Sequence, residues 1–70
     1  PEKPLRLLSV VIPARDEQGC VASTVENLHL ELAQHGILHE ILVVDDGSTD
    51  RTWAILGEVQ SRIPQLKPLR

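Results

Sequence analysis

Two short runs of apolar residues, at 7–12 and 41–44, predict two buried strands. The second run is Ile-Leu-Val-Val, and consecutive apolar, largely β-branched residues are typical of a strand that is covered on both faces of a parallel sheet. The first run is followed by Pro13. Because proline has no N–H to donate to a neighbouring strand, we expect the first strand to end there.

Between the two runs, the apolar spacing changes to that of a helix over residues 20–35. Gly36 follows directly, in the position where a glycine commonly ends a helix. The predicted apolar stripe consists of Val21, Val25, Leu28 and Leu32, widened by Leu30 and Ala33.

A second helix is predicted over about 50–63, where the next residue is a proline. Residues 48–50, Ser-Thr-Asp, can cap the free N–H groups at its start, and for Ser48 and Asp50 we favour this role over a ligand contact. Trp53 lies one position off the apolar stripe, so we expect it to be partly buried against a part of the domain outside this segment. The stripe consists of Thr52, Ile55, Leu56, Val59 and Ile63.

The order is therefore strand, helix, strand, helix, and then the beginning of another strand at 66–70. This alternation predicts an α/β fold with a Rossmann-like parallel sheet and flanking helices. In such a sheet the carboxyl ends of the two strands, Pro13-Ala14-Arg15 and Asp45-Asp46, open at the same edge, which is where ligands bind. The incipient last strand also indicates that residues 1–70 are the amino-terminal piece of a larger domain.

Asp45 and Asp46 end the second predicted strand. Two carboxylates without partners are costly in a dry core, so we expect both outside it, at the carboxyl edge of the sheet. Glu17, in the charged loop after the first strand, adds a third carboxylate to this rim. Such a rim suits ligand groups that donate hydrogen bonds, such as ribose hydroxyls or the ring N–H of uracil or guanine.

The same rim is a poor site for a bare diphosphate, because like charges repel. Residues 14–19 contain one glycine and match neither a dinucleotide-binding loop nor a P-loop. A nucleotide could bind there if a divalent cation neutralised its phosphates. Each of these residues also has an alternative role that involves no ligand. Asp45 could serve solely to shape the turn, and Arg15 could be a solvated loop residue. Glu17 could interact with the positive end of the next helix.

Composition narrows the class of protein. The 70 residues carry a formal charge of −3 with no basic cluster, which argues against nucleic acid as a partner. One cysteine, Cys20, cannot form an internal disulfide and fits a reducing compartment such as the cytoplasm. We expect Cys20 to be a small buried residue rather than a nucleophile, and His29, His35 and His39 to lie on solvated surface.

Residues 8–17, Leu-Ser-Val-Val-Ile-Pro-Ala-Arg-Asp-Glu, and residues 40–52, Glu-Ile-Leu-Val-Val-Asp-Asp-Gly-Ser-Thr-Asp-Arg-Thr, together resemble the start of glycosyltransferase family 2. Within this family the chain is most similar to the polyprenyl- and dolichyl-phosphate sugar transferases. The two blocks and the helix between them cover nearly the whole chain in the right order. The resemblance implies the nucleotide-binding half of a GT-A fold, with 1–70 as its incomplete amino-terminal part.

The resemblance also implies a donor site, in which the loop after the first strand wraps the nucleoside and the end of the second strand contacts the base. Many members carry Tyr-Asn where this chain has Arg15-Asp16, so one stacking surface for the base is missing. No catalytic residue is implied within the chain, because the catalytic base and the Asp-x-Asp type motif for magnesium or manganese are expected downstream of residue 70. The implied nucleotide-binding residues are Pro13, Ala14, Arg15, Glu17, Val44, Asp45 and Asp46.

The implied reaction is transfer of a sugar from a nucleoside diphosphate sugar to an acceptor, for which a polyprenyl phosphate at a membrane surface is one candidate. Residues 1–70 alone should be inactive. The longest apolar runs are too short to cross a bilayer, so any membrane attachment would lie outside this segment. Two alternatives are a non-catalytic α/β binding module and a phospho-acceptor receiver domain, although a receiver carries its acidic pair on its first strand.

Overall fold

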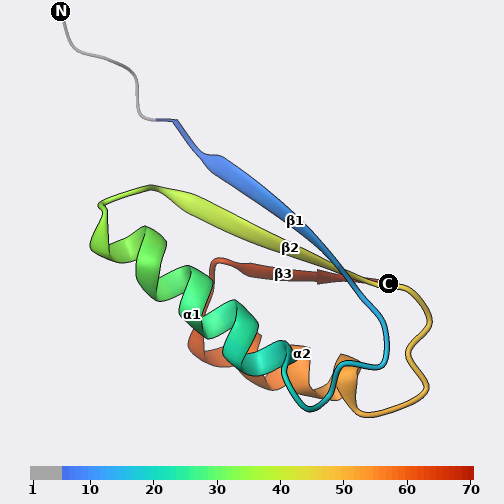
Figure 1. Cartoon of the computed structure of the whole chain (residues 1–70). Coiled ribbons are helices and arrows are strands. Elements are labelled where there is room, and N and C mark those ends of the chain that lie inside the picture. The colour runs from blue at the N-terminus through green and yellow to red at the C-terminus, as the bar shows by residue number, and fades with distance from the viewer. Residues whose placement is uncertain (1–5) are drawn as a thin grey trace, which may run out of the picture.

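A computed structural model describes residues 6–70 as a three-stranded sheet with two helices (Figure 1). The strand order is β1-β2-β3, with β2 in the middle, and both pairings are parallel. The predicted α/β class, the alternation of elements and the parallel pairing are therefore confirmed. The elements are β1 (Leu8–Ala14), α1 (Val21–Gln34), β2 (His39–Asp45), α2 (Thr52–Arg62) and β3 (Leu66–Leu69).

Strand β1 runs through Pro13, so the prediction that the strand ends at this proline is wrong. The hydrogen bonds explain why. Leu8 donates its N–H to Leu38 O and Ala14 accepts one from Asp46 N, so every second residue of β1, from 8 to 14, faces β2. The nitrogen of Pro13 points to the free edge of the sheet, where a missing N–H costs no bond between strands.

Strand β3 contains a proline for the same reason. Ile41 of β2 donates its N–H to the carbonyl oxygen of Gln65, so the odd-numbered residues of this stretch face β2. Pro68 is even-numbered and therefore faces the other free edge. The two outer strands each place a proline where it interrupts no hydrogen bond.

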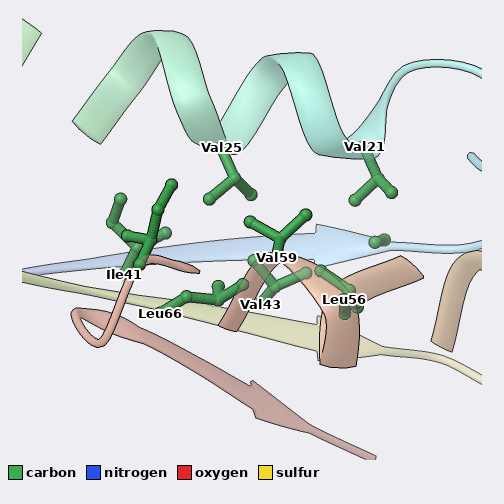
Figure 2. Close-up of a cluster of buried hydrophobic side chains, with 9 residues drawn as sticks. Val21, Val25, Ile41, Val43, Leu56, Val59 and Leu66 are labelled. Atoms are coloured by element: carbon green, nitrogen blue, oxygen red, sulfur yellow. The ribbon is translucent and has the colours of Figure 1, made fainter. Parts of the chain in front are cut away.

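Both helices pack on one face of the sheet and form a single aliphatic core with it (Figure 2). Burial alternates along β2, and Ile41 and Val43 on the helix-facing side are fully buried. The predicted stripes of the helices supply most of the remaining core. The core cluster consists of Ala14, Val21, Val25, Ile41, Val43, Leu56, Val59, Ile63 and Leu66.

The opposite face of the sheet, which we call the open face, differs from the prediction of a strand covered on both sides. Leu42 and Val44 of β2 are half-buried there, and Val11 of β1 is 64% exposed. In Figure 1 both helices lie on the other side of the sheet. Among residues 6–70, the central strand is therefore covered on one face only.

Helix α1 ends as predicted at Gly36, which has a positive φ of 66° that suits a residue without a side chain. Gly36 N donates to Ala33 O, and Ile37 N donates to Leu32 O. This pair of bonds is the Schellman arrangement that satisfies the last carbonyls of a helix. The predicted widening of the apolar stripe is wrong, because Leu30 is 57% exposed and Ala33 is also exposed.

Candidate functional site

The carboxyl ends of β1 and β2 meet at one edge of the sheet, as the sequence predicts. Ala14 pairs with Asp45 and Pro13 pairs with Val44 in the parallel register. The ladder continues for one more residue, because Asp46 N donates to Ala14 O over 2.9 Å. The chain segments that carry the predicted nucleotide-binding residues are thus held side by side, and the loops that follow them lie together in Figure 1.

Asp45, the last residue of β2, lies inside the protein and is 2% exposed, so the prediction that both acids lie outside the core is wrong for this one. Its position on the helix-facing side of β2 explains the burial. Its Oδ1 accepts hydrogen bonds from the backbone N–H and the hydroxyl of Ser48. Gly47 between them has a φ of 72°, which allows the tight turn.

The second oxygen of Asp45 has no hydrogen-bond donor among residues 6–70. Nε of Arg70 lies 3.7 Å from this Oδ2, which is an ion pair rather than a hydrogen bond. The guanidinium of Arg70 also lies 5.0 Å from the centre of the Trp53 ring. Trp53 is half-buried, as predicted, and it holds the cation that compensates the buried carboxylate.

Asp46, Glu17 and Arg15 are exposed at the rim of this edge. The backbone of Glu17 is fixed on both sides, since its N–H donates to Thr52 Oγ1 and its carbonyl accepts from Cys20 N and Val21 N. The carboxylate of Glu17 thus leaves a rigid position next to the start of α1. The backbones of Glu17 and Asp46 are held by hydrogen bonds, and all three charged side chains face solvent, where a polar ligand can reach them.

The capping roles predicted for Ser48 and Asp50 are only partly correct. The residue before the first turn of α2 is Arg51, whose side chain makes no capping bond. Asp50 accepts from the backbone N–H of Thr52 over 2.8 Å, so it does satisfy a free N–H at the helix start. The hydroxyl of Thr52 also donates to Asp50 and lowers the pKa of that carboxyl, as do the N–H groups of Thr52 and Gln18, while desolvation acts in the opposite direction.

Ser48 instead joins the two loops, which sequence reasoning did not find. Its hydroxyl accepts the N–H of Asp16 over 2.9 Å, and Thr49 N donates to the Asp16 carboxylate over 2.7 Å. Asp16 has a φ of 50°, and this left-handed backbone is one that aspartate tolerates better than most residues. The partners are more than 30 residues apart in the chain, so no local pattern indicates them.

A family model named glycosyl transferase family 2 matches residues 9–70 of this chain. The chain belongs to that family. The match covers both strands and both helices that build the edge described above. The resemblance seen in the two sequence blocks is therefore confirmed. The family match does not support the alternative of a phospho-acceptor receiver domain.

Individual relatives cover the chain well but extend far beyond it. A beta-monoglucosyldiacylglycerol synthase of Synechocystis is 37% identical over 96% of this chain and 14% of the relative. An undecaprenyl-phosphate 4-deoxy-4-formamido-L-arabinose transferase of Edwardsiella ictaluri is 37% identical over 86% of the chain and 18% of the relative. A dolichol-phosphate mannosyltransferase of Pyrococcus furiosus is 39% identical over 81% of the chain and 16% of the relative. The chain spans less than a fifth of each of these relatives.

Residues 6–70 of this family member contain no group of three or more His, Cys, Asp or Glu side chains that could hold a metal ion. The magnesium or manganese ligands were expected downstream of residue 70, so that expectation stays a prediction. Cys20 is exposed just before α1, which contradicts the prediction that it is buried. In the same part of the chain, neither helix has the length and apolar character needed to cross a membrane.

Proposed function

We propose that this chain binds the nucleotide of a nucleoside diphosphate sugar, as part of a glycosyltransferase that transfers the sugar to an acceptor. One observation carries the proposal. The hydrogen bond from Asp46 N to Ala14 O sets an exposed carboxylate beside the loop that holds Arg15 and Glu17. Membership of glycosyl transferase family 2 supports a sugar nucleotide as the ligand of this edge.

Each proposed contact follows from what the groups can donate or accept. Asp46 would accept a ring N–H of the base, and Glu17 would accept a ribose hydroxyl. The backbone of Pro13–Arg15 would flank the nucleoside, and the backbone of Val44 would line the same edge. A nucleotide contact from Asp45 stays a prediction. Its side chain is 2% exposed and its Oδ1 already accepts two hydrogen bonds, which disfavours a direct contact with a ligand.

For the acceptor we propose a lipid or lipid phosphate at a membrane surface. Two of the relatives are named for undecaprenyl phosphate and dolichol phosphate, and a third is named for a glucosyl diacylglycerol. We place the enzyme on the cytoplasmic side, in keeping with the single cysteine. The residues that bind the divalent cation, and the catalytic base, would lie outside this segment.

A non-catalytic nucleotide-binding module is the remaining alternative, since the same edge could bind a nucleotide without any transfer. The two functions differ in turnover. Transfer of sugar from a nucleoside diphosphate sugar to a lipid acceptor by the whole protein, measured as release of nucleoside diphosphate, would exclude a binding module.

The test of donor binding is a calorimetric titration of uridine and guanosine diphosphates, with magnesium or manganese, into the whole protein and into Asp46→Ala and Asp46→Asn. Loss of one partner of a charge-assisted hydrogen bond should weaken binding about tenfold to hundredfold in Asp46→Ala. Asp46→Asn keeps an acceptor oxygen and loses the charge, so its affinity should fall between.

Glu31→Ala is the matched control, because Glu31 is an exposed carboxylate near the far end of α1. It should bind like the wild type. Thermal melts of all variants separate contact from stability. Unchanged affinity of Asp46→Ala together with a lowered melting temperature would assign Asp46 to the turn and remove the proposed contact.

A further inference from the structure

Two hydroxyl groups connect the loops at the carboxyl edge in the same way. The hydroxyl of Ser48 donates to Asp45 Oδ1 and accepts the N–H of Asp16 over 2.9 Å. The hydroxyl of Thr52 donates to Asp50 Oδ1 and accepts the N–H of Glu17 over 2.8 Å. We call these two chains of carboxylate, hydroxyl and amide the hydroxyl relays.

The direction of each relay is fixed by its ends. An ionised carboxylate can only accept hydrogen bonds, and a backbone N–H can only donate one. The single hydroxyl proton is therefore donated to the carboxylate, and a lone pair of the hydroxyl oxygen accepts the backbone N–H. An alanine or valine cannot join a donor to an acceptor in this way. Thr52 is fully buried and Ser48 is 7% exposed, so water is poorly placed to replace either hydroxyl.

Further bonds tie the same loops together. Gln18 N donates to Asp50 Oδ2 over 3.2 Å, and Arg51 N donates to Gln18 Oε1 over 3.0 Å. With the two relays, the amides of three successive residues, 16–18, all donate to side chains of the loop after β2 or of the first residue of α2. These bonds hold the backbone around Glu17 next to the loop that begins with Asp46, directly after β2.

We infer that Ser48 and Thr52 are positioning residues of the donor-nucleotide site. They hold the loop that carries Arg15 and Glu17 against the end of β2, so that Glu17 and Asp46 reach one ligand together. This inference rests on the proposed function. It adds that the affinity of the site depends on two hydroxyls that do not themselves touch the nucleotide.

The test compares Thr52→Val, which keeps the shape and loses the hydroxyl, with Thr52→Ser, which keeps the hydroxyl. The ligand is the diphosphate, of uridine or of guanosine, that the wild type binds. In the whole protein, Thr52→Val should bind this ligand with an affinity roughly tenfold lower than that of the wild type. Thr52→Ser should stay within about threefold of the wild type. Thr24→Val is the matched control, because Thr24 is exposed on α1, and it should bind normally.

A second comparison separates positioning from general loss of stability. Val59→Ala removes core volume at a residue that is 1% exposed and lies outside both loops. It should lower the melting temperature and leave nucleotide affinity unchanged. If Val59→Ala weakens binding as much as Thr52→Val at a similar loss of melting temperature, affinity simply follows stability and the inference fails.

A double-mutant cycle tests whether Thr52 acts through Glu17. In a Glu17→Ala background the backbone N–H remains but the carboxylate is gone, so Thr52→Val should cost much less affinity than in the wild type. If Thr52→Val fails to fold, Ser48→Ala with Ser48→Thr as its rescue gives the same comparison at the other relay.

The outcomes for the two proposals can be told apart. A wild-type protein that binds neither nucleotide with either metal overturns the proposed function, and the positioning role falls with it. A wild-type protein that binds, with Thr52→Val and Ser48→Ala binding equally well at lower melting temperatures, overturns only the positioning role.

Discussion

His29 of α1 and His39 of β2 share a hydrogen bond, with 2.8 Å between His29 Nδ1 and His39 Nε2. A third group fixes the direction of this bond. His39 Nδ1 lies 2.7 Å from the carbonyl oxygen of Ile37, which can only accept, so this nitrogen carries the proton. In the neutral ring Nε2 is then the acceptor, and His29 donates. Because His39 is 6% exposed, His29 supplies the partner that a buried ring nitrogen needs.

The first prediction follows from this pair. His29→Ala leaves Nε2 of His39 without its donor, and we expect a loss of about 1 kcal/mol in the free energy of unfolding. The cost should not be larger, because a cavity of about 280 Å³ beside both rings gives water access. Urea unfolding of the whole protein measures the loss. His35→Ala, at an exposed residue just past α1, should change nothing, and equal effects of the two substitutions would refute the role of the bond.

The second prediction concerns pH. Hydrogen bonds from Thr52 and Gln18 lower the pKa of Asp50 in the folded protein, so the unfolded chain binds a proton more readily. The stabilisation is therefore fully present above the ordinary aspartate pKa of about 4, and it is lost as the pH falls further, through the lowered pKa of the folded state. Asp50→Asn cannot titrate, and its amide NH₂ takes the place of one of the two carboxylate oxygens.

Urea unfolding from about pH 6 to about pH 3 tests this prediction. The wild type should be more stable than Asp50→Asn at the upper end, and the difference should shrink toward the lower end. A difference that stays constant over the whole range would show that Asp50 contributes no pH-dependent stability.

Much of the fold could be predicted because its main elements are local patterns. The stripe of α1 is narrower than predicted. Leu30 lies two residues from both Leu28 and Leu32, and at about 100° per residue that is the opposite side of a helix. Its 57% exposure therefore agrees with the helical period and not with a wider stripe.

His39 was predicted to lie on solvated surface, and Asp45 was predicted to lie outside the core because burial of a lone charge is costly. Both predictions are wrong, since both side chains are buried. The positions of His39, Ile41, Val43 and Asp45 differ by multiples of two, so the strand period alone puts all four on one face. Their compensation could not be predicted. The donor to His39 comes from another element, and Arg70 reaches Asp45 from the end of β3.

The sequence predicts which segments form the candidate site, but it does not predict the hydrogen bonds that hold these segments together. The carboxyl-edge rule placed Asp46 next to the β1 loop, because it depends only on parallel strands. The bonds of Ser48 and Thr52 to the amides of Asp16 and Glu17 depend on the packing of both helices, which the sequence pattern does not specify.

The third prediction tests the core. Leu56 of α2 is fully buried between the helices and the sheet, so Leu56→Ala should lower the free energy of unfolding by about 2–5 kcal/mol. Leu30→Ala deletes the same atoms from an exposed position and should change it by less than about 0.5 kcal/mol. Chemical denaturation of the whole protein measures both, and similar losses would mean that the two helices do not pack as described.

The last prediction concerns a protein made of residues 1–70 alone. Val11 is 64% exposed and Leu69 is 47% exposed on the open face, with Leu42 and Val44 half-buried between them. Because contiguous apolar surface of this kind promotes association, we expect concentration-dependent sedimentation and a broad thermal transition. Val11→Lys with Leu69→Lys adds charge to that face without touching the core and should shift the species toward monomer. A monomeric wild type with a sharp, cooperative transition would contradict the expectation that these residues are part of a larger domain.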